Sequence, residues 1–143
     1  MRRLLTIPVL VLLLSGHVVA APTRFAYVDV YVDSADRPLA AYQLELKADA
    51  GDVKIVGIEG GEHAAFKPAP YYDKAAMSGD RVILAAFNTG NDLPKGKTRV
   101  ARVMVQVTGD AKPEYRFTLT TAATTGGEKI PAVVSIVQRG EEP

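Results

Sequence analysis

The sequence has no cysteine and no tryptophan, and only two histidines occur among its 143 residues. Without cysteine the chain can form no disulfide, no thiolate metal site and no cysteine nucleophile. Its 17 basic and 16 acidic side chains nearly cancel, whereas nucleic-acid binding needs an excess of Lys and Arg. Hydrophobic residues make up 48% of the chain, which is enough for a packed core. These counts exclude several kinds of chemistry and favour none.

The first twenty residues have the layout of a secretory signal peptide. Arg2 and Arg3 precede an apolar run over residues 4–14, and the small-residue exit follows as Val18-Val19-Ala20. The run is too short to span a bilayer, for which about 20 apolar residues are needed. We predict cleavage after Ala20, a secreted protein (extracellular or periplasmic), and no stable membrane insertion. The alternative is a buried N-terminal helix.

The predicted mature domain, residues 21–143, has a different charge balance from the whole chain. Arg2 and Arg3 leave with the signal peptide, so 15 basic and 16 acidic side chains remain. This balance gives no support for attraction to nucleic acid or to an anionic membrane.

Beyond residue 22 the chain alternates between apolar and polar side chains in short segments that turn residues separate. Such alternation is typical of half-buried strands, and no window shows a helical stripe. The expected strands are 25–32, 39–47, 53–59, 81–87, 98–108, 115–120 and 132–138, with a short edge strand considered at 64–66. We therefore predict an all-β fold, an antiparallel two-sheet β-sandwich with jelly-roll topology and about 8–9 strands.

The alternation also predicts which side chains face the core. In each strand, apolar positions two residues apart share one face. Tyr42, Leu44 and Leu46 are expected to share one face, as are Val56 and Ile58. The predicted inward sets are Ala101, Val103, Val105 and Val107, and Tyr115, Phe117 and Leu119.

Four stretches carry a resemblance to a known family. They are VDVYVDSADRPLAAYQLELKAD (28–49), VKIVGIEGG (53–61), RVILAAFNTGNDLPKGKTRVARVMVQVTG (81–109) and GGEKIPAVVSIVQRG (126–140). In this order they resemble the cohesin domain, the nine-stranded jelly-roll module of cellulosome scaffolding proteins. The resemblance implies a cohesin-like, non-catalytic domain that binds the dockerin of a partner protein with one sheet face, the calcium belonging to the dockerin.

The resemblance also implies where the partner binds, and the chain departs from the family there. Cohesins offer Asn and Asp from the strand that matches residues 39–47, whereas this chain has Ala41 and Gln43 at those positions, followed by Glu45. The predicted partner-binding residues are Ala41, Gln43, Glu45, Asn88, Asn91 and Asp92.

Little in the sequence points to catalysis or to a metal. His63 follows Gly60-Gly61-Glu62 in an expected loop, and neither Gly-x-Ser-x-Gly nor His-Glu-x-x-His occurs. Most aspartates lie where turn chemistry places them, so we predict no catalytic residues, no enzyme and no cofactor. Asp33-x-x-Asp36 and Asn88-x-x-Asn91-Asp92 gather oxygen ligands without the EF-hand spacing, which leaves a structural calcium open but not predicted.

Aromatic residues supply the alternative function, a carbohydrate-binding module that binds polysaccharide directly. The candidate glycan-binding group is Phe66, Tyr71 and Tyr72, which lie in one proline-rich stretch. We expect these three rings to be exposed together. The lack of Trp weakens this hypothesis, because its larger ring suits sugar stacking. Tyr71 and Tyr72 could instead cap one edge of the core, one ring inward and one outward.

The first hypothesis is dockerin-type recognition of a protein partner in an extracellular polysaccharide-degrading context.

Overall fold

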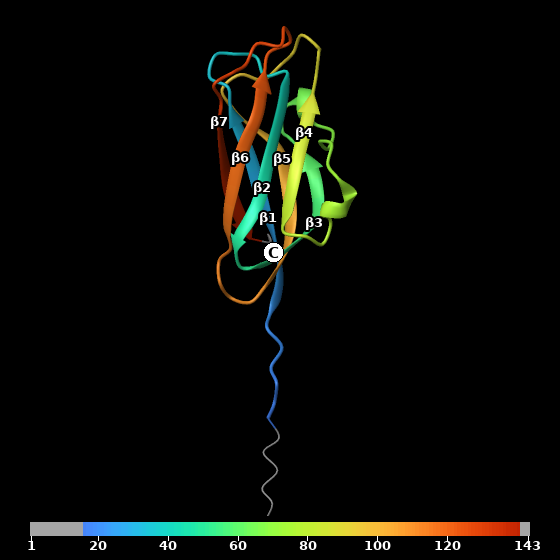
Figure 1. Ribbon diagram of the computed structural model, residues 1–143, viewed down its shortest axis with the longest axis vertical. Helices are drawn as coiled ribbons and strands as arrows, with labels where there is room; N and C mark the ends of the chain where they lie inside the picture. Colours follow the sequence, from blue (N-terminus) through green and yellow to red (C-terminus); the bar gives the residue numbers. More distant parts are fainter. Residues whose placement is uncertain (1–15, 141–143) are drawn as a thin grey trace, which may run out of the picture.

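The computed structural model of the protein describes residues 16–140. Residues 16–22 have no helix or strand, are exposed, and run away from the body of the molecule (Figure 1). Residues 1–15, most of the predicted signal peptide, lie outside the described residues.

The described residues form seven strands and two short 3-10 helices. In chain order these are β1 (Thr23–Asp33), β2 (Ala41–Ala50), β3 (Asp52–Gly60), η1 (Ala64–Phe66), η2 (Lys74–Ala76), β4 (Arg81–Phe87), β5 (Lys97–Thr108), β6 (Glu114–Ala123) and β7 (Val133–Gly140). The predicted all-β sandwich is confirmed.

Two details of the strand prediction need correction. The described residues hold seven strands, and not the expected eight or nine. The short edge strand considered at 64–66 is instead the 3-10 helix η1, whose first turn is capped by His63: its Nδ1 accepts a hydrogen bond from the Ala65 N–H at 3.1 Å. Pro68 and Pro70 follow directly and lack the N–H groups that a strand would donate.

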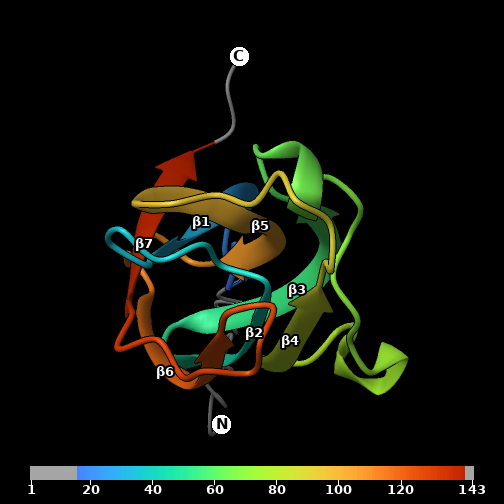
Figure 2. The same cartoon turned by 90° about the horizontal axis from the view of Figure 1, so that it is seen from above.

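The odd-numbered strands form one sheet and the even-numbered strands form the other. The four-stranded sheet has the order β3-β5-β1-β7 and the three-stranded sheet the order β4-β2-β6, and all their pairings are antiparallel. Every connection therefore passes from one sheet to the other across the core (Figure 2). No two consecutive strands pair, so no hairpin turn sets the register of any strand pair.

The core lies between the two sheets and consists mainly of Val and Leu. Tyr42, Leu44 and Leu46 of β2 are buried, as are the alternate positions from Ala101 to Val107 of β5, which confirms these two predicted faces. The Tyr42 hydroxyl donates a hydrogen bond to the Val100 carbonyl at 3.3 Å. That bond satisfies the buried hydroxyl and joins β2 to β5.

Strand β3 breaks the strict alternation. Ile55 pairs with Val105 and Gly57 pairs with Met104, so Val56 is the extra residue of a β-bulge. The bulge turns Val56 outward, where it is 43% exposed, while Ile58 packs against the core. The expectation that Val56 and Ile58 share a face is therefore wrong.

A pair of glycines ends β3 and brings the next loop against β5. A Cβ on Gly60 would lie 2.0 Å from the Lys67 carbonyl oxygen, and one on Gly61 would lie 2.3 Å from the Arg99 carbonyl oxygen. Both distances are far below van der Waals contact. The close approach lets the Gly61 N–H donate to the Phe66 carbonyl at 2.7 Å and the Glu62 N–H donate to the Arg99 carbonyl at 3.0 Å.

Replacing Gly61 by Ala is expected to lower the free energy of unfolding by more than about 2 kcal/mol, because backbone must move to admit the methyl group. Urea unfolding measures the change. Gly126→Ala is the matched control, since its nearest neighbour would be the Thr124 hydroxyl at 3.9 Å. Equal losses in the two variants would contradict the close approach.

Candidate functional site

The outer face of the three-stranded sheet carries three of the predicted partner-binding residues. Ala41, Gln43 and Glu45 occupy alternate positions of β2, the central strand, on the side away from the core. Gln43 lies between Ala85 of β4 and Thr121 of β6. The middle of this face therefore bears short side chains, which leave it flat.

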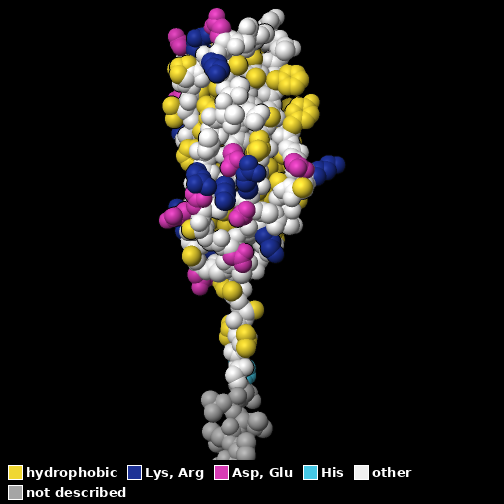
Figure 3. Space-filling view, in the orientation of Figure 1, with side chains coloured by type: hydrophobic (Ala, Val, Ile, Leu, Met, Phe, Trp, Pro, Cys, Tyr) yellow, Lys and Arg dark blue, Asp and Glu magenta, His cyan; other side chains and the backbone are white. Residues whose placement is uncertain are grey.

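Charged side chains gather at one end of the same face, in the lower half of Figure 3. Arg81 donates a hydrogen bond to Glu45 at 2.6 Å, and Arg116 lies 3.3 Å from Asp49. The hydrogen bond from Arg81 holds the pKa of Glu45 below its ordinary value. Both ion pairs are exposed, so they add little to stability and remain accessible to a partner.

Aromatic rings lie at the opposite end, and they differ from the predicted set. Tyr71 and Phe87 are 71% and 66% exposed and stack with ring centroids 6.3 Å apart. Phe66 is 2% exposed and packs edge-on against Tyr42, while Tyr72 packs against the core. The expectation that Phe66, Tyr71 and Tyr72 are exposed together is therefore wrong, and Tyr71 and Tyr72 take the outward and inward positions of the alternative.

The exposed ring beside Tyr71 is Phe87, which sequence reasoning missed. Phe87 is the last residue of β4, and a backbone bridge between Tyr71 and Ala85 fixes the two rings next to each other. A shallow pocket of about 220 Å³ borders Tyr71, Phe87 and Asn88. The alternation of β4 places Phe87 on the same face as Ile83 and Ala85, a signal that was present in the sequence.

The predicted loop residues lie beyond β4 and are partly engaged within the chain. Asn88 donates to the Ala65 carbonyl at 3.1 Å and accepts from the Gly90 N–H at 2.7 Å, so its amide braces the loop. The Asp92 carboxylate lies 3.5 Å from His63 Nε2, which links the loops after β3 and β4. Asn91 is exposed. Of the three, Asn91 and Asp92 are the residues that a partner could reach.

In the part of the chain that the structure describes, no three His, Asp or Glu side chains gather as metal ligands. Asp33, one of the oxygen ligands weighed for calcium, accepts a hydrogen bond from the Ala35 N–H at 2.9 Å. No helix among residues 16–140 has the length and apolar character to cross a membrane.

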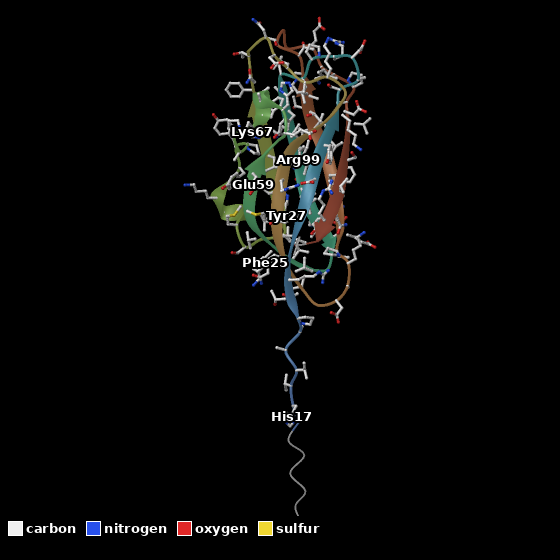
Figure 4. All side chains as sticks on the ribbon, turned by 180° about the vertical axis from the view of Figure 1, so that it is seen from behind. His17, Phe25, Tyr27, Glu59, Lys67 and Arg99 are labelled. Carbon is white, nitrogen blue, oxygen red and sulfur yellow. The ribbon has the colours of Figure 1, made fainter. Side chains whose placement is uncertain are left out.

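The four-stranded sheet has a different outer face, which centres on a buried carboxylate. Asp29 of β1 is 1% exposed and lies among three arginines. Arg102 of β5 donates to its two oxygens at 2.6 and 3.0 Å, and Arg139 of β7 donates at 2.7 Å. Arg99, labelled in Figure 4, lies 3.8 Å away.

The arginines determine the charge state of Asp29. Burial by itself raises the pKa of this carboxyl, but hydrogen bonds from Arg102 and Arg139 outweigh burial and hold the pKa below its ordinary value. The carboxylate in turn joins β5 and β7 to β1, the strand between them. Asp29 is thus a structural anion in the middle of a sheet.

We compared the chain with protein-family models, with curated proteins and with solved structures. None of the three comparisons finds a match. The cohesin resemblance therefore stays a prediction.

Replacing Asp29 by Asn is expected to lower the free energy of unfolding at neutral pH by about 2–3 kcal/mol, because three arginines lose their common anion. The folded-state pKa of Asp29 lies below the ordinary value, so the stabilisation is present above about pH 4 and is lost as the pH falls through the folded-state pKa. The difference in unfolding free energy between the wild type and the variant should therefore shrink in acid. Urea unfolding across this pH range measures it.

Asp49→Asn is the matched control, because Asp49 makes an exposed pair with Arg116. It should cost at most about 0.5 kcal/mol. A loss of stability in Asp29→Asn that is as small as the loss in the control would contradict the role of Asp29. A difference in unfolding free energy that persists in acid would contradict it as well.

Proposed function

We propose that the protein is an exported, non-catalytic binding module that holds a protein partner on the outer face of the β4-β2-β6 sheet. One observation carries the proposal: a flat stretch of short side chains around Gln43 separates the exposed Tyr71–Phe87 pair from the Arg81–Glu45 ion pair. Aromatic and arginine side chains are enriched in protein interfaces. A partner with a complementary face could contact all three regions at once.

The shape of this face favours a macromolecule over a small ligand. The pockets that border it hold about 220 Å³ beside Phe87 and about 280 Å³ beside Arg81. Small-molecule sites usually enclose about 300–1,000 Å³. A flat surface that carries both charge signs suits a protein surface with matching charges.

The proposed partner is a dockerin-type module in an extracellular polysaccharide-degrading context. Two features support it. The cohesin resemblance assigns partner contacts to residues 39–47, and these residues include most of β2, the central strand of the proposed face. The predicted signal peptide would deliver the domain to the compartment in which such assemblies work.

Direct polysaccharide binding is the second candidate, and the stacked rings of Tyr71 and Phe87 favour it. Their exposed surface could lie against the face of a sugar ring. The two rings stack on each other at an interplanar angle of 12°, so each offers one free side. A row of separate rings along a strand would support this candidate more strongly.

Gln43→Arg is expected to weaken dockerin binding at least about tenfold, because it places a long cation in the middle of the flat stretch. Titration calorimetry with a panel of purified dockerin modules in calcium measures the affinity. Gln106→Arg is the matched control: Gln106 lies on β5, on the outer side of the other sheet, opposite Phe25, and its replacement should leave binding unchanged.

The same proteins, applied to insoluble polysaccharide, test the second candidate. Retention that is lost in the double variant Tyr71→Ala plus Phe87→Ala, without any dockerin binding, would replace the first proposal by the second. Equal effects of Gln43→Arg and Gln106→Arg on dockerin binding would contradict the proposed face.

A further inference from the structure

The two sides of the sandwich differ in how far their strand edges are covered. Strands β3 and β4 are the edge strands of one side. The Ile55 N–H of β3 donates to the Gly79 carbonyl at 2.7 Å, and the Ile55 carbonyl accepts from the Ser78 N–H at 2.8 Å. Tyr71 and Ala85 of β4 exchange two hydrogen bonds, at 2.7 and 3.0 Å. The chain between β3 and β4 therefore supplies partners to both edges of this side.

The other side, formed by β6 and β7, is largely open. The chain that joins these strands covers the last residues of β6, where the Ile130 N–H donates to the Ala122 carbonyl at 2.8 Å. Within residues 16–140, β7 pairs with β1 alone, and no loop backbone hydrogen-bonds to it. Figure 2 shows β7 at the outer end of its sheet. The N–H and C=O groups along its outer edge are therefore available to another strand.

Apolar side chains reach the surface at this open side. Phe117 of β6 pairs in register with the buried Leu46 and so points toward the core, yet it is 37% exposed. Val133 at the start of β7 is 65% exposed, and Ile136 is only partly buried. A second molecule placed against this side would remove these side chains from water.

Strand β7 lacks the features by which natural edge strands avoid pairing, such as charges, prolines and bulges. The six residues from Val133 to Gln138 include no charged residue and no proline, and the register between β7 and β1 has no bulge. Strand β6, in contrast, carries the exposed Arg116 and a bulge at Thr120. Of the two edges, that of β7 is better suited to pairing.

We propose that β7 pairs antiparallel with β7 of a second copy of this chain, about a two-fold axis at Ser135, so that two four-stranded sheets become one continuous sheet. Such an axis places one residue opposite its own copy. With Ser135 on the axis, Val133 lies opposite Val137 of the second copy, and Val134 lies opposite Ile136. Apolar side chains then meet on both faces of the joined sheet, and the two Ser135 hydroxyls face each other.

The sequence of β7 selects this register. Moving the axis by one residue in either direction would place Val133 opposite Ser135 or opposite Arg139 of the second copy. Charge favours the same axis, because a charged side chain near a two-fold axis meets its own copy and is repelled. The charged residue of β7, Arg139, lies four residues from Ser135.

The open side is large enough for a dimer interface. Eight residues of β7 at about 3.4 Å each give it a length of about 27 Å. Two sheets about 10 Å apart, with about 5 Å of side chain beyond each, give it a height of about 20 Å. The two copies together would bury about 1,000 Å², which is the lower limit for a specific interface. We therefore expect a dissociation constant in the micromolar range.

The dimer would present both proposed partner faces in the same direction. The axis is perpendicular to the sheets, so the outer faces of the two β4-β2-β6 sheets lie side by side. Two linked partners could then bind with higher avidity than one. The pairing of β7 does not itself depend on the proposed function.

Sedimentation equilibrium of the purified protein tests the dimer. Val133→Lys should raise the dissociation constant of the dimer at least about tenfold, because it places a hydrated charge opposite Val137 of the second copy. Val133 is exposed in the single chain, so the fold should not change. Val56→Lys is the matched control: Val56 is 43% exposed on β3, the edge strand at the other end of the same sheet. It should leave the dimer intact.

The lack of cysteine in the chain allows the register to be tested with single cysteine variants. Opposite residues of an antiparallel pair have Cα atoms about 4.5–5.5 Å apart, which a disulfide can span. Ser135→Cys should therefore form a covalent dimer under mild oxidation. Val133→Cys and Val137→Cys should each cross-link poorly alone and efficiently when the two are mixed.

Three results would each overturn the proposal. A wild type that stays monomeric at millimolar concentration would leave the edge of β7 to a strand of a different protein. Equal weakening of the dimer by Val133→Lys and Val56→Lys would place the contact elsewhere. Cross-linking of Val133→Cys alone that is as fast as that of Ser135→Cys would exclude pairing about Ser135.

Discussion

The four-stranded sheet depends on the ion pairs that the buried carboxylate of Asp29 makes with Arg102 and Arg139. Every connection between strands crosses the core, so no tight turn fixes which residue of β1 pairs with which residue of β5 or β7. Hydrophobic alternation selects the buried face, but a slip of two residues would preserve that face. The bonds from Arg102 and Arg139 to Asp29 oppose such a slip, because it would leave a buried charge without its partners.

The same cluster makes the two outer faces of the sandwich different. One Asp29 cannot neutralise three arginines, so the four-stranded sheet keeps exposed cationic donors beside Tyr27. The three-stranded sheet instead pairs its arginines with exposed carboxylates and leaves a flat stretch around Gln43. The two outer faces of the sandwich therefore differ in charge and in shape.

Alternation in the sequence was sufficient to predict the sandwich and the buried faces of β2 and β5, because regular strands keep a period of two. It failed at Val56, where a bulge inserts one residue, and at Phe66, which a 3-10 helix turns into the core. The arginine cluster could not be predicted, because Arg102 and Arg139 lie 73 and 110 residues from Asp29. The one available signal was an aspartate in the middle of a Val-rich strand, where this residue type is depleted.

The arginines outweigh burial at Asp29, and a measured pKa of its carboxyl group tests this most directly. NMR can follow the side-chain carboxyl carbon of Asp29 from about pH 7 down to about pH 2, the range that spans ordinary aspartate titration. We expect a midpoint below the ordinary value of 3.8. A midpoint at or above that value would mean that burial dominates, and it would contradict the role of the carboxylate as the anion that holds β1, β5 and β7 together.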